Sequence, residues 1–248
     1  LNHLGVHVVE VFLTSFSEYG YPFAETLRNC KGGLFVNSVH SLNTHYEPQL
    51  FNAHPCVKGD AYAWLEKVLD SANALGAPYY TFHGTARIKR AARREGADNF
   101  PKMVEDFAEL LEFCQRHGTR LCLENVEWAT YNRPGVFHEL AKELPTLSGV
   151  LDIKQARISE YPYERYLEEM GERLAYVHIS DCDERGKMCL PGQGAFDFDT
   201  LVKRLQGVGF DGAILIEVYN RDYQELSELK RSYDFVQETL YRNGCLNS

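Results

Sequence analysis

The sequence lacks an apolar run long enough for a membrane helix, and it lacks an excess of basic residues. No apolar stretch approaches the roughly 18 residues that a membrane-spanning helix needs, and residues 1–5 do not resemble a signal peptide. Lys and Arg number 26 against 35 Asp and Glu, which gives a formal net charge of -9. Because phosphate binding depends largely on Lys and Arg, we expect neither a nucleic-acid nor a membrane partner. A basic cluster within residues 87–94 is interpreted as a solvated helix face rather than an anion-binding rim.

Paired-cysteine and glycine-rich motifs are also missing. The 7 cysteines are odd in number, and none belongs to a Cys-x-x-Cys pair. Several lie in apolar runs, so we expect reduced, mostly buried thiols in a cytoplasmic protein. No Gly-x-Gly-x-x-Gly sequence follows any expected strand, so nothing supports dinucleotide binding.

What the sequence does contain is a regular alternation of short apolar runs and amphipathic helical patterns. Parallel strands joined by helical crossovers are typical of this alternation. The clearest helical patterns cover residues 60–75, with Asp60 as the expected cap, and 99–117. We find no linker or change of composition, so residues 1–248 are expected to form a single domain. The expected strands are residues 7–13, 34–40, 78–83, 119–124, 149–153, 174–180 and 213–219.

The length and the strand pattern favour an α/β fold of the (β/α)8 TIM-barrel type, which is about 250 residues long. Such a barrel has eight strands, whereas seven are recognisable in this sequence. Because residue 1 is Leu, we expect the first strand and most of its helix to lie upstream, with residues 1–5 as the end of that helix. An open, doubly wound sheet is the alternative.

Ionisable residues stand at the ends of four successive expected strands: Glu124, Asp152, His178 and Glu217. The carboxyl ends of parallel barrel strands meet on one face, so these side chains are expected to converge. Three carboxylates packed together without a cation would repel one another and would need raised pKa values. Two Glu, one Asp and one His instead suit a single divalent cation such as Mn, Mg, Co or Zn.

Several short motifs occur in a characteristic order along the chain. They are HGT at 83–85, LENV at 123–126, LDI at 151–153, HISD at 178–181, PGQGAFDF at 191–198 and IEVY at 216–219. As an ordered set, they resemble the sugar phosphate isomerase/epimerase family, which has the xylose isomerase-like barrel and shares its superfamily with endonuclease IV. The similarity covers essentially the whole chain. It implies that Glu124, Asp152, His178 and Glu217 are the metal ligands, and that Glu124 and Glu217 are also the acid/base pair.

This resemblance implies an isomerase or epimerase that acts on a small sugar or a related polyhydroxy carbonyl compound. The metal polarises the carbonyl and acidifies the adjacent C–H, one Glu removes the proton, and a proton returns to the resulting enediolate. A dehydratase of a sugar acid or inosose is the alternative, because the same enediolate can expel a hydroxyl group. An endonuclease IV-like nuclease and a non-catalytic sugar-binding barrel are further alternatives. The sequence leaves open whether the chain forms a homo-oligomer.

Two positions depart from the pattern of many relatives. Gln155 stands where many have a His, and no Asp-x-His pair follows the strand of His178, so the three-zinc site of the nuclease looks incomplete. Lys154 is unusual beside a metal ligand; it either binds a substrate carboxylate or phosphate or points to solvent. Both residues are hypothesised to contact substrate.

Three further residues are hypothesised to line the pocket and contact substrate, and each has a structural alternative. His83 is the strongest of them, because it ends an expected strand. His40 also ends a strand, but it could simply be a capped strand-end residue. Glu10 lies in the first expected strand, where a salt bridge at the edge of the core is the alternative.

Overall fold

The apolar runs of the sequence form parallel strands that pair side by side. The structure is a computed structural model and describes residues 1–42, 44–85 and 100–245, so the basic cluster within 87–94 lies outside the described residues. Seven strands join in the order β1-β2-β3-β4-β5-β6-β9, with every pairing parallel. These strands are β1 (Val8–Leu13), β2 (Phe35–Ser41), β3 (Tyr79–Phe82), β4 (Arg120–Glu124), β5 (Ser148–Asp152), β6 (Leu174–Ile179) and β9 (Ala213–Ile216).

The sheet curves into a nearly closed barrel. β1 and β9 come into contact, although no strand pairing joins them within the described ranges. The expected TIM-barrel fold and its seven recognisable strands are therefore confirmed, and no eighth strand of this sheet lies in the described part of the chain. Residues 1–5, expected to be the end of a helix, contain the short 3-10 helix Asn2–Leu4.

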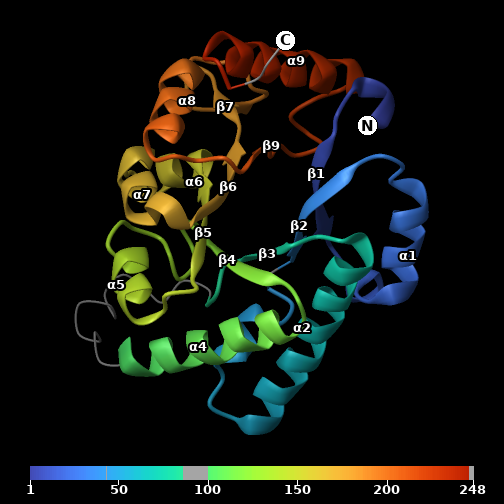
Figure 1. Cartoon of the computed structure of the whole chain (residues 1–248), viewed down its shortest axis with the longest axis vertical. Coiled ribbons are helices and arrows are strands. Elements are labelled where there is room, and N and C mark those ends of the chain that lie inside the picture. The colour runs from blue at the N-terminus through green and yellow to red at the C-terminus, as the bar shows by residue number, and fades with distance from the viewer. Residues whose placement is uncertain (43, 86–99, 246–248) are drawn as a thin grey trace.

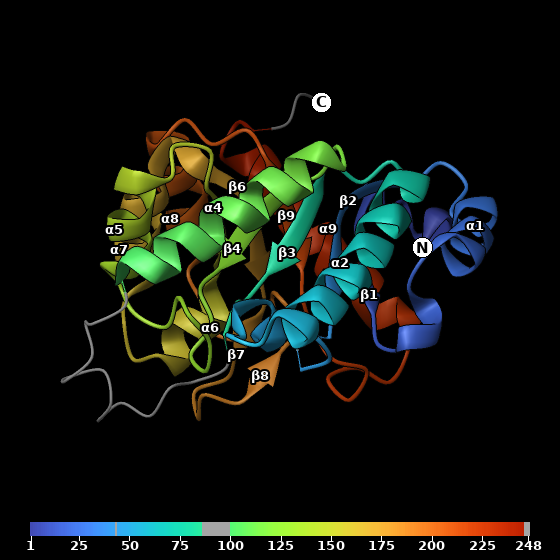
Figure 2. The same ribbon diagram turned by 90° about the horizontal axis from the view of Figure 1, so that it is seen from below.

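Helices surround the strands on the outside (Figure 1). Seen from below, the small antiparallel hairpin of β7 (Asp181–Cys182) and β8 (Met188–Cys189) lies toward one end of the barrel (Figure 2). None of the helices in the described ranges is both long enough and apolar enough to cross a membrane. They are α1 (Tyr21–Cys30), α2 (Pro55–Leu75), α4 (Phe100–Arg116), α5 (Val136–Glu143), α6 (Ile153–Ile158), α7 (Tyr163–Met170), α8 (Phe198–Gly207) and α9 (Leu226–Arg242).

Two helices differ from the sequence-based expectation. α2 begins at Pro55 rather than at Asp60, because proline suits the first turn of a helix, where its missing N–H costs nothing. The end of α2 is as expected, since Gly76 follows it with a left-handed φ of 72°. The short helix α6 was not predicted; it begins directly after β5, where the Asp152 side chain accepts a hydrogen bond from Gln155 N.

The alternation of side chains along the strands decides which residues face the barrel interior. Cys122, Val150, Tyr176 and Leu215 form a small apolar cluster, separate from the larger core that includes Leu121, Leu123, Leu151 and Val177. Because successive side chains of a strand point to opposite faces, residues two positions further along share the side of the small cluster. Those residues are Glu124, Asp152, His178 and Glu217.

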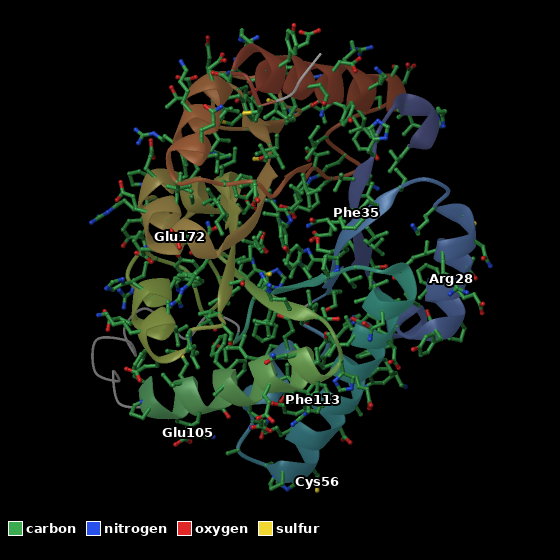
Figure 3. All side chains as sticks on the ribbon, viewed as in Figure 1. Arg28, Phe35, Cys56, Glu105, Phe113 and Glu172 are labelled. Carbon is green, nitrogen blue, oxygen red and sulfur yellow. The ribbon has the colours of Figure 1, made fainter. Side chains whose placement is uncertain are left out.

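The cysteines agree only partly with expectation. All seven are free thiols, and all lie in the described ranges. However, only Cys114 and Cys122 are buried, so the expectation of mostly buried thiols is wrong. Cys30, Cys56 and Cys245 are exposed, and Figure 3 shows Cys56 at the outer edge of the molecule. Cys30 and Cys56 lie at the ends of helices and Cys245 follows α9, so none of the three lies in a buried strand.

A glycine in the loop after β8 is expected to be indispensable for packing. A Cβ at Gly194 would overlap the carbonyl oxygen of Cys182 and Oδ1 of Asp181. We expect Gly194→Ala to lower the free energy of unfolding by about 2 kcal/mol, measured by urea denaturation. Gly207→Ala is the matched control, because nothing lies within 4 Å of a Cβ there. It should be neutral or stabilising by up to about 1 kcal/mol, since alanine is the better helix former. Equal effects of the two substitutions would contradict the close packing.

Candidate active site

The four ionisable residues at the strand ends meet inside the barrel. Glu124, Asp152, His178 and Glu217 each offer a ligand atom, and these atoms all lie within 4.8 Å of one another. His178 Nδ1 is 2.9 Å from Glu124 Oε1 and 3.6 Å from Glu217 Oε2. The side chain of Glu217 is 31% exposed, whereas the other three are nearly completely buried. The group therefore combines a buried floor with one carboxylate that solvent can reach.

This cluster has the features of a cation site. Asp152 Oδ2 and His178 Nε2 are buried and make no hydrogen bond within the described part of the chain; their charged neighbours are Lys154 Nζ and Glu10 Oε1, each 3.3 Å away. Burial raises the pKa of Asp152 well above its usual value; Lys154 opposes that effect, and the charges of Glu217 and Glu124 add to it. A divalent cation would relieve this crowding of carboxylates. The donor set thus fits one divalent metal, which the four predicted residues would hold.

Glu124 and Glu217 stay ionised despite their burial. Burial alone would raise the pKa of Glu124, but hydrogen bonds with His178 and His83 outweigh it and hold the pKa well below the usual value. For Glu217, burial is likewise outweighed by the charges of His178 and Lys154, which lower its pKa. Both glutamates are therefore carboxylates at neutral pH, as a proton acceptor or a metal ligand must be.

Glu10 lies in the barrel interior and binds two histidines. Its carboxylate accepts hydrogen bonds from the hydroxyls of Ser38 and Thr81, each at 2.5 Å. The same group lies 3.1 Å from His40 Nδ1 and 3.3 Å from His178 Nε2. Burial would raise its pKa, but the charges of His178 and His40 lower the pKa well below the usual value. Glu10 thereby fixes the ring orientation of His178 and leaves Nδ1 to face Glu124 and Glu217.

Glu47 is a site residue that the sequence analysis missed. It is completely buried in a 3-10 helix (Glu47–Phe51) and lies 3.2 Å from His83 Nδ1. It also accepts hydrogen bonds from the backbone N of His83 and from the Tyr80 hydroxyl. No local pattern could have identified it, because 36 positions separate it from His83.

His83 is held between Glu47 and two other site residues. Its Nε2 lies 2.9 Å from His40 Nε2 and 3.0 Å from Glu124 Oε2. Burial would lower its pKa, but Glu47 and Glu124 together raise the pKa of His83 to about 10. A proton on Nε2 accounts for the close approach of the two histidine nitrogens. His40, His83 and Glu124 also have ligand atoms within 4.8 Å of one another, so this second group shares Glu124 with the first.

The charge of Glu47 is expected to control the protonation of His83. In the metal-free protein, Glu47→Gln should lower the pKa of His83 from about 10 toward its ordinary value of 6.5, because Glu47 is the largest influence that raises it. Nitrogen-15 NMR of the imidazole rings as a function of pH measures this change. Glu109→Gln is the control, since Glu109 is half exposed and pairs with Lys58 rather than with histidine. An unchanged His83 pKa in the Glu47 variant would show that Glu47 does not control it.

Lys154 and Gln155 lie at the start of α6, beside Asp152. Lys154 Nζ is buried and pairs with Glu217 Oε2 at 2.9 Å and with Asp152 Oδ2 at 3.3 Å. It therefore does not point to solvent, which was one of the two alternatives for it. Burial would lower its pKa, but Asp152 and Glu217 raise it above the usual value. The Gln155 side chain accepts a hydrogen bond from the backbone N of Glu127 at 3.4 Å.

A cavity of about 1140 Å³ opens onto these groups. All of the predicted site residues except Asp152 and Lys154 line it, together with Trp128 and Tyr219. The cavity continues along the contact between β1 and β9, where Val8, Leu205 and Val236 make its wall apolar. The cavity as a whole is large enough for a small polyhydroxy compound, and Glu124 and Glu217 are among the residues that line it.

The pattern that defines the xylose isomerase-like TIM barrel family matches residues 1–239. The chain belongs to this family. The resemblance drawn from the ordered motifs is thereby confirmed. The family accounts for the parallel barrel, and the site described above lies at the carboxyl ends of its strands.

The relatives of this family member include sugar epimerases. Fructoselysine 3-epimerase of Escherichia coli O157:H7 is 26% identical over 123 residues, which are 47% of this chain and 45% of that protein. The match thus spans less than half of that relative. Among solved structures, D-psicose 3-epimerase with D-tagatose, from Clostridium cellulolyticum H10, has a TM-score of 0.76 at 17% identity, covering 96% of this chain and 90% of that one. The IolI protein with a bound zinc atom has a TM-score of 0.69 at 14% identity, covering 94% and 87%. At these identities the two structures show the fold.

Proposed function

We propose that this protein is a divalent-metal-dependent sugar epimerase or isomerase, and specifically that it inverts a carbon next to the carbonyl of a ketose. The observation that carries the proposal is the convergence of Glu124, Asp152, His178 and Glu217 in the polar end of the barrel. The names of similar proteins point the same way, since fructoselysine 3-epimerase and D-psicose 3-epimerase are named for epimerisation at the carbon next to a ketose carbonyl.

Glu124, Asp152, His178 and Glu217 would hold the cation. When bound there, it supplies Lewis acidity that polarises a substrate carbonyl and lowers the pKa of the adjacent C–H. Glu10 keeps His178 oriented for this role from the opposite ring nitrogen, 3.3 Å away. His83 and His40, which line the cavity, are proposed to bind substrate hydroxyls.

The two glutamates are proposed to move the proton. Glu124 is the base, because His83 and His178 keep it ionised. Glu217 is proposed to return the proton: it is a carboxylate at rest, and its 31% exposed side chain can take up a proton from solvent before passing it to the substrate. β5 and β6 separate the strands of the two residues, so they approach a bound sugar from different sides. A proton removed on one side and returned on the other inverts the carbon. Removal of a proton from C1 of the ketose, and its return at C2, would produce an aldose instead.

Incubation with ketoses in D2O tests the proposal. The protein is loaded in turn with Mn, Mg, Co and Zn and offered D-fructose, D-tagatose, D-psicose and fructoselysine. We expect one solvent deuterium at the inverted carbon of an unrearranged epimer, detected by NMR. Deuterium in an aldose would identify an isomerase, and a dehydrated product would identify a lyase. No deuterium in any sugar with any of the metals would refute the proposed function.

A further inference from the structure

Lys154 is an unexpected neighbour for a cation site, because its positively charged ammonium lies within the site itself. The side chain is 4% exposed, and its ammonium contacts two of the four candidate metal ligands. A buried ammonium is stable only where carboxylates neutralise it, and Asp152 and Glu217 do so here. In the metal-free protein, the Lys154 ammonium therefore neutralises part of the negative charge of the four candidate ligands. A bound cation would neutralise the same charge.

The ammonium and a metal ion would need the same two oxygen atoms. Asp152 Oδ1 already accepts the hydrogen bond of Gln155 N, so Oδ2 is the atom that remains for a metal. That Oδ2 is the atom 3.3 Å from Lys154 Nζ. On Glu217, the oxygen that faces His178 Nδ1 is Oε2, and this is the atom 2.9 Å from Lys154 Nζ. A cation bonded to both oxygens therefore replaces the ammonium as their partner.

A second cavity beside Lys154 could accept the displaced ammonium. Lys154 also lines a second cavity of about 220 Å³, together with Ser180 and Asp181. Asp181 is buried, and four backbone N–H groups donate to its two oxygens at 2.8–3.0 Å. The second cavity thus offers the ammonium a negative charge and hydrogen-bond acceptors behind the metal site.

We propose that Lys154 is a built-in competitor for the metal, and that a divalent cation enters the site by displacing the Lys154 ammonium from Asp152 and Glu217 toward Asp181. The inference rests on the metal-binding part of the proposed function. The competition makes binding at this site depend on the charge of the entering ion. A divalent ion provides enough attraction to three carboxylates to displace a single positive charge, whereas a monovalent ion does not. It also keeps the buried carboxylates paired while the protein has no metal.

Isothermal titration calorimetry of the metal-free protein with Mn(II) measures the Mn(II) affinity and so tests the competition. Lys154→Met and Lys154→Gln remove the charge, and each should bind Mn(II) at least about tenfold more tightly than the wild type, because no ammonium has to be displaced. Lys58→Met is the matched control: Lys58 is also a partly buried lysine with two carboxylate partners, but these are Asp106 and Glu109 on α4. Its Mn(II) affinity should equal that of the wild type.

The outcomes distinguish a failure of the proposed competition from a failure of the proposed function. Equal or weaker binding by both Lys154 variants, with binding retained by the wild type, overturns the competition and leaves the metal-dependent function standing. Binding by the Lys154 variants alone supports the competition and removes metal dependence from the wild type. Absence of binding by all the proteins overturns both. Two different Lys154 substitutions keep the comparison open if one of them fails to fold.

Discussion

Replacing Glu124 with glutamine is expected to slow the exchange of substrate protons with solvent by about 10⁴-fold. The substitution removes the proposed base and, at the same time, one ligand of the proposed metal. It also removes the carboxylate that pairs with His178 Nδ1 at 2.9 Å and with His83 Nε2 at 3.0 Å. Deuterium incorporation into the ketose that the wild type accepts, followed by NMR with the metal in excess, measures the rate.

Glu109→Gln serves as the control for this experiment. Glu109 lies on α4, is 52% exposed and pairs with Lys58, so the exchange rate should not change. Circular dichroism and the unfolding transition show whether the Glu124 variant retains its fold. A folded Glu124→Gln protein that exchanges protons within tenfold of the wild-type rate would rule out Glu124 as the base.

Removal of the metal is expected to have the second large effect. Chelation should abolish proton exchange and should also lower the melting temperature, because a ligand that binds only the folded state stabilises it. Metal at a hundredfold excess over its dissociation constant adds about 2.7 kcal/mol, or a rise of about 5–10 °C for a chain of this size. Differential scanning fluorimetry with Mn(II) or with chelator measures the shift. Asp152→Asn should melt at the same temperature under both conditions, whereas a full Mn(II) shift in this variant would place the metal elsewhere.

The metal-dependent shift is also expected to depend on pH. The pKa values of Asp152 and His178 are raised in the metal-free protein, so both groups hold protons at low pH. A metal binds the deprotonated forms, and its binding must release these protons. The shift in melting temperature should therefore grow as the pH rises through the neutral range and shrink as it falls. A shift that is constant between pH 5.5 and 8.5 would contradict the raised pKa values.

The barrel and the convergence of the four ionisable residues at its strand ends could be predicted because their signals are local. Each strand gives a short apolar run, and an ionisable residue such as Glu124 ends the run on the same face as Cys122. The two-residue period of a strand places such residues in the interior without any knowledge of long-range contacts. The ordered motifs then indicated the family, which the match over residues 1–239 confirmed.

The contacts around the metal residues could not be predicted, because they join distant parts of the chain. Glu47 contacts His83 from the 3-10 helix Glu47–Phe51, 36 positions away, and Lys154 contacts Glu217 across 63 positions. Lys154 pairs with two carboxylates rather than with solvent, and its contact with substrate stays a prediction. The substrate contacts proposed for His40, His83, Gln155 and Glu10 stay predictions, although Glu10 has four partners within the protein.

The position of the metal is the point on which the whole account depends. Anomalous diffraction from crystals of the protein grown with Mn(II) locates the ion directly. We predict a single anomalous peak about 2.0–2.2 Å from oxygens of Glu124, Asp152 and Glu217 and from a nitrogen of His178. Absence of a peak there, or a peak bonded to other residues while these four carry none, would contradict the account.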